Sequence, residues 1–122
     1  MEEKVDLVNN PLHYSKYAIS LEPIDILEDL GFNYGNAFKY FIRSKDKGNE
    51  LQDLKKAQWY IKRAKQRKEE LTETQKYMLA LYLNHAGIWA RVASKPLNPD
   101  YVDHICFAYI WDRIHALEGD SK

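Results

Sequence analysis

Residues 35–64 read GNAFKYFIRSKDKGNELQDLKKAQWYIKRA, two stretches of helical period on either side of a turn. From about Gly35 to Ser44, apolar residues recur three and four positions apart, which predicts an amphipathic helix. Lys47-Gly48-Asn49 is a turn signal, and Asn49 is a favourable N-cap for a second helix over about Glu50 to Glu70. The two expected inner stripes are Ala37, Phe38, Phe41 and Ile42, then Leu51, Leu54, Ala57, Ile61 and Ala64.

Three further helices are expected outside this hairpin. A short one follows Glu22-Pro23, because proline suits a first helical turn, and it ends at Gly31. The capping box Thr72-Glu73-Thr74-Gln75 begins another helix, which runs to about Ala93. Asn98-Pro99 begins the last helix. Alternation of period two is absent, so the expected fold class is all-α, a compact bundle of about five helices.

Length and composition limit the class of protein. A chain of 122 residues with 45% hydrophobic residues suits a single domain over residues 1–122. The single cysteine, Cys106, excludes an internal disulfide framework and fits a reducing cytosol. Residues 1–21 show no clear period and no secretory signal, so we expect an extended N-terminal arm and a cytoplasmic protein. No apolar run approaches the ~20 residues of a membrane span, which argues against a membrane partner.

Aromatic residues and one apolar helix predict a homo-oligomer. The chain contains nine Tyr and three Trp, more than a small core needs. Between Tyr77 and Ile88 the expected fourth helix is apolar nearly all round, so it is either central in the bundle or an oligomer contact.

The charge of the chain is segregated. Residues 39–68 hold 11 of the 18 Lys and Arg but only 3 of the 18 Asp and Glu, a net charge of +8 (11 − 3). The remainder is therefore at −8 (7 − 15). This pattern predicts an anion site on a basic face. Nucleic acid is not the favoured partner, because the acidic remainder would repel its backbone.

Four motifs follow one another between residues 10 and 60. They are Asn10-Pro11-x-His13-Tyr14, Glu22-x-Ile24-Asp25, Gly35-Asn36-x-x-Lys39-Tyr40-x-x-Arg43-x-x-x-Lys47-Gly48 and Asp53-Leu54-x-Lys56-Ala57-x-x-Tyr60. Together they resemble a small phage protein family catalogued as a domain of unknown function, which includes a Walker-less nucleotide kinase. The resemblance covers residues 10 to about 65. It implies a nucleotide ligand, a phosphotransferase acting on deoxynucleoside monophosphates, and a place in the cytosol of a host cell. Residues 70–122 form a helical half to which it assigns no role.

The residues themselves suggest how a phosphate would be held. Lys39 and Arg43 lie one helical turn apart, so they can bind one anion together, Lys39 as a point charge and Arg43 as a bidentate fork. Lys47 and the N–H groups that open the next helix add donors. Asn36 is placed either to read a base or ribose edge or to cap its helix. The expected ligand-binding residues are His13, Tyr14, Asn36, Lys39, Tyr40, Arg43, Lys47, Lys56 and Tyr60, with Tyr40, Trp59 and Tyr60 as stacking rings. The alternative for each lysine or arginine is a solvated or paired surface charge.

A phosphotransferase would use Lys39, Arg43 and Lys47 on the transferring phosphoryl group and Asp25 or Asp53 on Mg²⁺. The expected catalytic residues are Lys39, Arg43 and Asp25, the expected metal ligands are Asp25 and Asp53, and no tightly bound organic cofactor is expected. A P-loop kinase is excluded, since its motif is absent. One alternative is a non-catalytic protein that sequesters a nucleotide signal or binds a host protein to counter host defence. Another is an all-α, Mg²⁺-dependent nucleotide pyrophosphohydrolase, for which Glu22, Asp25, Asp29, Glu50 and Asp53 would supply the carboxylates.

Overall fold

The computed structural model describes residues 22–46, 48–88 and 96–119, and within these ranges it contains helices and no strand. The helices are α2 (Pro23–Leu27), α3 (Phe32–Arg43), α4 (Glu50–Gln66), α5 (Glu73–His85) and α6 (Val102–Gly119), with a 3₁₀ turn, η2 (Pro99–Tyr101), before the last. The predicted all-α class is therefore confirmed. The expected N-terminal arm lies outside the described residues.

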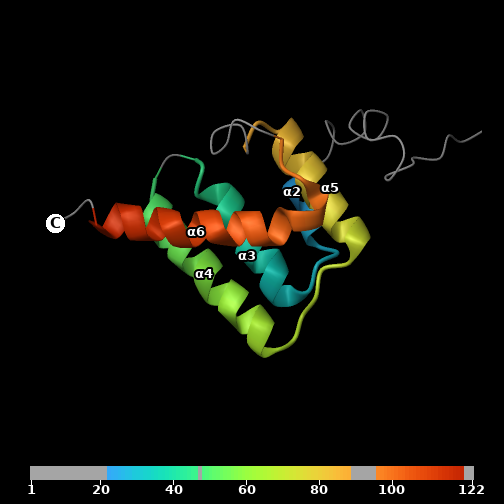
Figure 1. Ribbon diagram of the computed structural model, residues 1–122, viewed down its shortest axis with the longest axis horizontal. Helices are drawn as coiled ribbons and strands as arrows, with labels where there is room; N and C mark the ends of the chain where they lie inside the picture. The colour runs from blue at the N-terminus through green and yellow to red at the C-terminus, as the bar shows by residue number, and fades with distance from the viewer. Residues whose placement is uncertain (1–21, 47, 89–95, 120–122) are drawn as a thin grey trace, which may run out of the picture.

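Helices α3 and α4 form the predicted hairpin and lie side by side (Figure 1). Their facing positions are almost entirely buried, as the apolar period predicts. These positions are Ala37, Phe38, Phe41, Leu54, Ala57, Ile61 and Ala64. Ile42 and Leu51, which were also expected to be inside, are only partly buried at the edge of the core.

Helix α6 crosses α4 and reaches α5, so the second half of the chain covers one side of the hairpin (Figure 1). Its buried residues, among them Cys106 and Ile110, join those of every other helix in one apolar cluster. Helix α5 packs against α2, η2 and α6. Leu79, Ala80 and Leu83 are buried in these contacts, while most other residues of α5 are partly or fully exposed. Whether its apolar character also serves an oligomer contact stays a prediction.

Two helix boundaries differ from the sequence prediction for a shared reason. Helix α3 begins at Phe32, three residues before Gly35, because the Glu69 carboxylate accepts hydrogen bonds from the backbone N–H groups of Asn33 and Tyr34, each at 3.1 Å. The Asn33 side chain also donates to this carboxylate. These bonds satisfy donors that a helix N-terminus leaves open, and a negative charge suits that end of the helix.

Helix α4 ends at Gln66 rather than Glu70, and the turn after it delivers Glu69 to α3. Lys68 adopts φ 59°, its N–H bonds to the carbonyl of Lys65, and the N–H of Glu69 bonds to the carbonyl of Ala64 at 2.9 Å. This is a Schellman motif with lysine at the position that glycine usually occupies. Gly31 completes the arrangement, since a Cβ there would collide with the Glu69 carboxylate.

The later boundaries follow ordinary capping chemistry. Thr72 and Gln75 exchange the two bonds of the predicted capping box, at 3.1 and 2.9 Å. Helix α5 ends at His85, short of the expected Ala93, and Gly87 follows at φ 75°. In the described ranges, no helix is long and apolar enough to cross a membrane.

Candidate functional site

Three cationic side chains from two helices surround the ring of Tyr40. The Nζ atoms of Lys39 and Lys56 lie 4.9 and 5.2 Å from the ring centroid, and Cζ of Arg43 lies 6.0 Å from it. The negative face of an aromatic ring attracts cations at such distances. Tyr40 therefore gathers charge from α3 and α4 at one place. We call Lys39, Tyr40, Arg43 and Lys56 the Tyr40 cluster.

Aromatic rings continue from this cluster along the hairpin. Tyr40 stacks on Tyr60, with centroids 6.0 Å apart and planes 9° apart. Tyr60 in turn makes edge contacts with Phe32, at 6.1 Å, and with Trp59, at 5.0 Å. The two outer rings are largely exposed, Phe32 at 72% and Trp59 at 59%. Exposed rings beside cations are suited to a ligand that is both flat and anionic.

An acid lies at the edge of the cluster. Oδ2 of Asp53 is 3.6 Å from Nε of Arg43, and the Asp53 side chain is only 7% exposed. This carboxylate offsets part of the positive charge and fixes one end of the guanidinium. The other guanidinium donors extend toward solvent, since the Arg43 side chain is mostly exposed.

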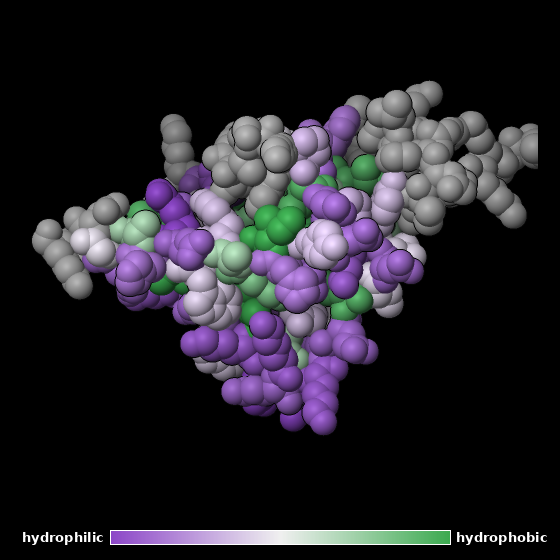
Figure 2. Space-filling model, in the orientation of Figure 1, coloured by the Kyte–Doolittle hydropathy of each residue, from purple (hydrophilic) through white to green (hydrophobic). Residues whose placement is uncertain are grey.

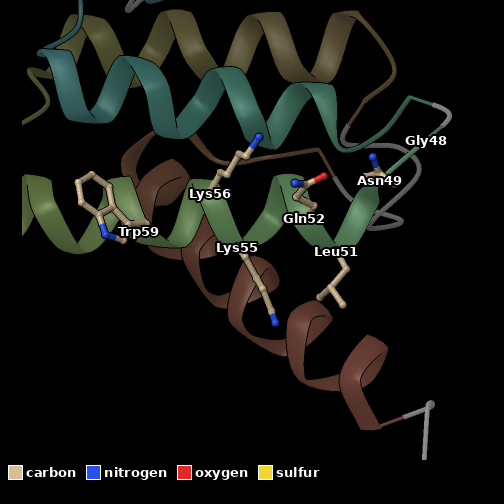
Figure 3. Close-up of a pocket in the computed structure, with 7 residues that line it drawn as sticks. All are labelled: Gly48, Asn49, Leu51, Gln52, Lys55, Lys56 and Trp59. Atoms are coloured by element: carbon tan, nitrogen blue, oxygen red, sulfur yellow. The ribbon is translucent and has the colours of Figure 1, made fainter.

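Adjacent lysines on α4 have different environments. Figure 3 shows Lys56 pointing toward α3 and Lys55 pointing the opposite way, toward α6. Nζ of Lys55 pairs there with Oε2 of Glu118 at 2.6 Å. An open groove of about 740 Å³ runs along α4 between them and ends at Trp59. Helical geometry thus assigns Lys56 to the Tyr40 cluster and Lys55 to a surface ion pair.

The other basic residues of segment 39–68 are mostly on the C-terminal part of α4 and in the turn that follows it. Figure 2 shows hydrophilic side chains gathered at the lower corner of the molecule, where α4 ends. The basic residues of this part are all exposed: Lys62, Arg63, Lys65, Arg67 and Lys68. Positive charge at a helix C-terminus is favourable on its own. These residues therefore do not require a ligand to explain their presence.

Asn36 lies within α3 and does not cap it. Its Nδ2 donates to the carbonyl oxygen of Phe32, four residues earlier, at 2.8 Å. Together with Lys39 it lines a second hollow, between α2 and α3. The capping interpretation is therefore wrong, because the helix begins one turn earlier than the sequence indicated.

Two of the carboxylates considered for Mg²⁺ have other partners. An oxygen of Asp25 accepts the backbone N–H of Glu22 at 2.8 Å, at the start of α2. Glu50 accepts two bonds from Arg113, at 2.9 and 3.1 Å, and lies 3.6 Å from Lys45. The Arg113 hydrogen bond holds the pKa of Glu50 below its usual range, and the charges of Arg113 and Lys45 add to this. Over the described part of the chain, no three His, Cys, Asp or Glu side chains form a possible metal site, so Mg²⁺ stays a prediction.

The structure thus brings together five of the predicted ligand-binding residues: Lys39, Tyr40, Arg43, Lys56 and Tyr60. His13, Tyr14 and Lys47 lie outside the described residues. Sequence reasoning missed Phe32, because the helix was expected to begin at Gly35. Its signal in the sequence was the four-residue spacing to Asn36, which places both on one face of an earlier turn.

Residues 8–62 match the model of a family described as a protein of unknown function (DUF3310). This match covers a little under half of the chain and includes α2, α3 and most of α4, and hence all of the Tyr40 cluster. It confirms the resemblance to a domain of unknown function. No curated protein and no solved structure matches the chain.

Proposed function

We propose that this protein binds a nucleotide, or a related phosphorylated small molecule, with its phosphate at the Tyr40 cluster. The observation that carries the proposal is the convergence of Lys39, Arg43 and Lys56 on one ring. Because each cationic group lies within 6.0 Å of the same centroid, no two can be more than about 12 Å apart, an upper limit that compares with a Debye length of about 8 Å at physiological salt. Like charges this close repel one another, and a bound anion relieves that repulsion.

A phosphate fits this arrangement better than a carboxylate does. It carries up to two negative charges and three acceptor oxygens, which match one guanidinium fork and two ammonium groups. A planar base fits the exposed rings next to the cluster. Charge and stacking surface at neighbouring places therefore favour a nucleotide over an inorganic anion.

Phosphoryl transfer to a deoxynucleoside monophosphate is the activity that the family resemblance implies. In that reaction Lys39 and Arg43 would stabilise the transferring phosphoryl group, with Lys56 as a further cation. Asp53, the carboxylate beside Arg43, would be the first candidate for an Mg²⁺ ligand.

Nucleotide sequestration without turnover is the second candidate function. It needs the same cluster but no carboxylate chemistry, and a specific observation favours it. Asp25 and Glu50, two of the carboxylates considered for a metal, already hold Glu22 and Arg113. The same contacts weaken the pyrophosphohydrolase alternative, which uses Glu50 with Asp53.

Binding of a host protein, a cytosolic location and a homo-oligomer stay predictions. For the last, light scattering at micromolar protein would contradict an oligomer by returning the 14.4 kDa monomer.

Calorimetry with deoxynucleoside monophosphates tests the binding site. We expect Lys39→Ala combined with Arg43→Ala to weaken binding by about tenfold or more, since two charge-assisted contacts are lost. Lys62→Ala, which removes a similar charge outside the cluster, is the matched control. Unchanged affinity in the double variant would show that the site is wrong.

Turnover separates the two functions. Labelled deoxynucleoside monophosphate is incubated with ATP and Mg²⁺, and the products are separated by chromatography. Formation of diphosphate supports the phosphotransferase. Tight binding in calorimetry without any diphosphate supports sequestration.

A further inference from the structure

A hollow between α2 and α3 adjoins the Tyr40 cluster. Its volume is about 470 Å³, which is within the range of about 300–1,000 Å³ found for small-molecule sites. Leu27 is buried at its apolar side, while Ile24, 61% exposed, and Phe32 stand at its rim. The hollow is therefore mostly apolar in its wall and open to solvent, and the exposed acid Glu28 also lines it.

A glycine lets the two helices approach each other at this hollow. A Cβ at position 35 would lie 3.1 Å from the backbone oxygen of Leu27, tighter than nine in ten such contacts, so Gly35 allows α2 to approach α3 closely. The open hollow between these helices has a mostly apolar lining. An apolar lining suits a flat ring better than a charged group.

One side chain belongs to both the hollow and the cluster. Lys39 lines the hollow, and its Nζ also lies over the Tyr40 ring. Along α3, Phe32 and Lys39 are separated by seven residues, or about 10 Å of helix. A ligand whose anionic end binds Lys39 therefore has the mostly apolar hollow directly beside it.

Asn36 adds a polar group between these two ends. One N–H of its amide donates to the Phe32 carbonyl. An amide carries a second N–H and an acceptor oxygen. A neighbouring donor and acceptor of this kind form a bidentate pair with a base edge, as asparagine does with adenine.

We propose that this hollow is the nucleobase site of the protein, in which Ile24 and Phe32 cover the base and Asn36 contacts its edge. The inference rests on the proposed nucleotide binding at the Tyr40 cluster and assigns the other end of the same ligand. Tyr40 itself is not the stacking surface, because its ring already stacks on Tyr60 and is surrounded by the three cations. Trp59 lines a separate groove along α4, which meets the cluster at Lys56; the hollow between α2 and α3 meets it at Lys39 and also contains Asn36.

The test compares ligands with and without a base. The full chain is titrated by calorimetry with the four deoxynucleoside monophosphates and with 2-deoxyribose 5-phosphate. We expect at least one monophosphate to bind about tenfold more tightly than the sugar phosphate, because a base stacks on an apolar surface. Ile24→Ser and Phe32→Ser should each remove most of this difference and leave the affinity for the sugar phosphate within about twofold, since neither touches a cation.

Controls make each outcome decisive. Tyr101→Ser removes an apolar side chain of similar exposure, 57%, on η2 and should leave all affinities unchanged. Asn36→Ala should change the ranking of the four bases. Ile24 and Phe32 are exposed enough that both variants are expected to fold, and circular dichroism verifies this.

Three results would overturn the inference. Equal affinity for the monophosphates and the sugar phosphate would remove the base site but leave the phosphate site standing. A base preference that survives both Ile24→Ser and Phe32→Ser would place the base outside the hollow between α2 and α3. Failure of every probe to bind the unmodified chain would refute the nucleotide function, and the base site with it.

Discussion

Two tyrosines in this protein gather cations in different ways. Around Tyr109, the ammonium group of Lys45 lies 4.3 Å from the ring centroid, and Glu50 joins Lys45 to Arg113. Around Tyr40, three cations converge on the ring, and Asp53 lies 3.6 Å from Arg43. The charges named around Tyr109 sum to +1 (2 − 1), and those around Tyr40 sum to +2 (3 − 1), so the positive excess is larger at Tyr40. The first arrangement serves the fold, and the second suits an anion from outside.

Breaking the Tyr109 network should give the largest loss of stability. Glu50→Ala removes the carboxylate that lies 3.6 Å from the Lys45 ammonium group, on a side chain only 8% exposed, and that also accepts from Arg113. We expect unfolding free energy to fall by about 2–3 kcal/mol, somewhat less than for a fully buried pair, because Glu50 and Arg113 are partly exposed. Urea denaturation measures it as a lower midpoint with an unchanged slope. Lys39→Ala in the Tyr40 cluster should change stability by less than about 0.5 kcal/mol. Equal losses in the two variants would contradict the comparison.

Glu69 offers the second largest effect, because it supplies a charge where α3 begins. Glu69→Gln keeps the shape of the side chain but removes the charge at the helix N-terminus. The expected loss is about 1–2 kcal/mol, from weaker bonds to the N–H groups of Asn33 and Tyr34 and a weaker dipole interaction. Glu70→Gln, one residue further on, is the control. A null result would mean that α3 starts at Phe32 without help from Glu69.

Acid should weaken both arrangements that depend on a glutamate. Burial alone would raise the pKa of Glu69, but hydrogen bonds from Tyr34 and Asn33 hold this pKa below its usual value. The hydrogen bond from Arg113 likewise lowers the pKa of Glu50. A lowered folded-state pKa means stability that is complete above the unfolded value, about 4.3, and is lost as pH falls through the folded values. Urea midpoints from pH 6 to pH 3 should therefore decline, and less steeply in Glu69→Gln. A stability that rises toward pH 3 would contradict these assignments.

The sequence predicts what depends on neighbours along the chain. The hairpin stripe, the capping box at Thr72 and the all-α class follow from local periods and caps, and all three are observed. The contacts of Glu69 with Asn33 and of Glu50 with Arg113 join residues 36 and 63 positions apart. No period indicates such a partner. Neither contact was therefore predicted, and the start of α3, where Glu69 binds, was missed.

The candidate site likewise has a part that local sequence predicts and a part that depends on distant contacts. The pair formed by Lys39 and Arg43 follows from one helical turn, and the resemblance implied Lys56. Their meeting over Tyr40 depends on how α3 and α4 are aligned, which the sequence does not specify. Phe32 was missed for the same reason as the start of α3, since Glu69 fixes that start from a distant position.

Asp53→Asn should shift the Tyr40 cluster further from neutrality. The substitution keeps the size of a buried side chain and removes the negative charge 3.6 Å from Arg43. Affinity for a deoxynucleoside monophosphate, measured by calorimetry without Mg²⁺, should rise about threefold, because one repulsion is removed at an intermediate effective dielectric. Asp46→Asn, an exposed acid of the turn, is the control. Weaker binding would show that Asp53 helps to hold Arg43 in its binding position.

The smallest effect should come from Lys68, which touches neither tyrosine. Its φ of 59° is costly for a residue with a Cβ, and glycine adopts it freely. Lys68→Gly should therefore raise the unfolding free energy by about 0.5 kcal/mol, a net value after the extra entropy that glycine gains in the unfolded chain. Urea denaturation measures this change. Lys62→Gly, inside α4, is the control, and its unfolding free energy should fall by about 1 kcal/mol. Because Lys68 is outside the Tyr40 cluster, its substitution should leave nucleotide affinity unchanged, and a change in affinity would extend the binding surface to the end of α4.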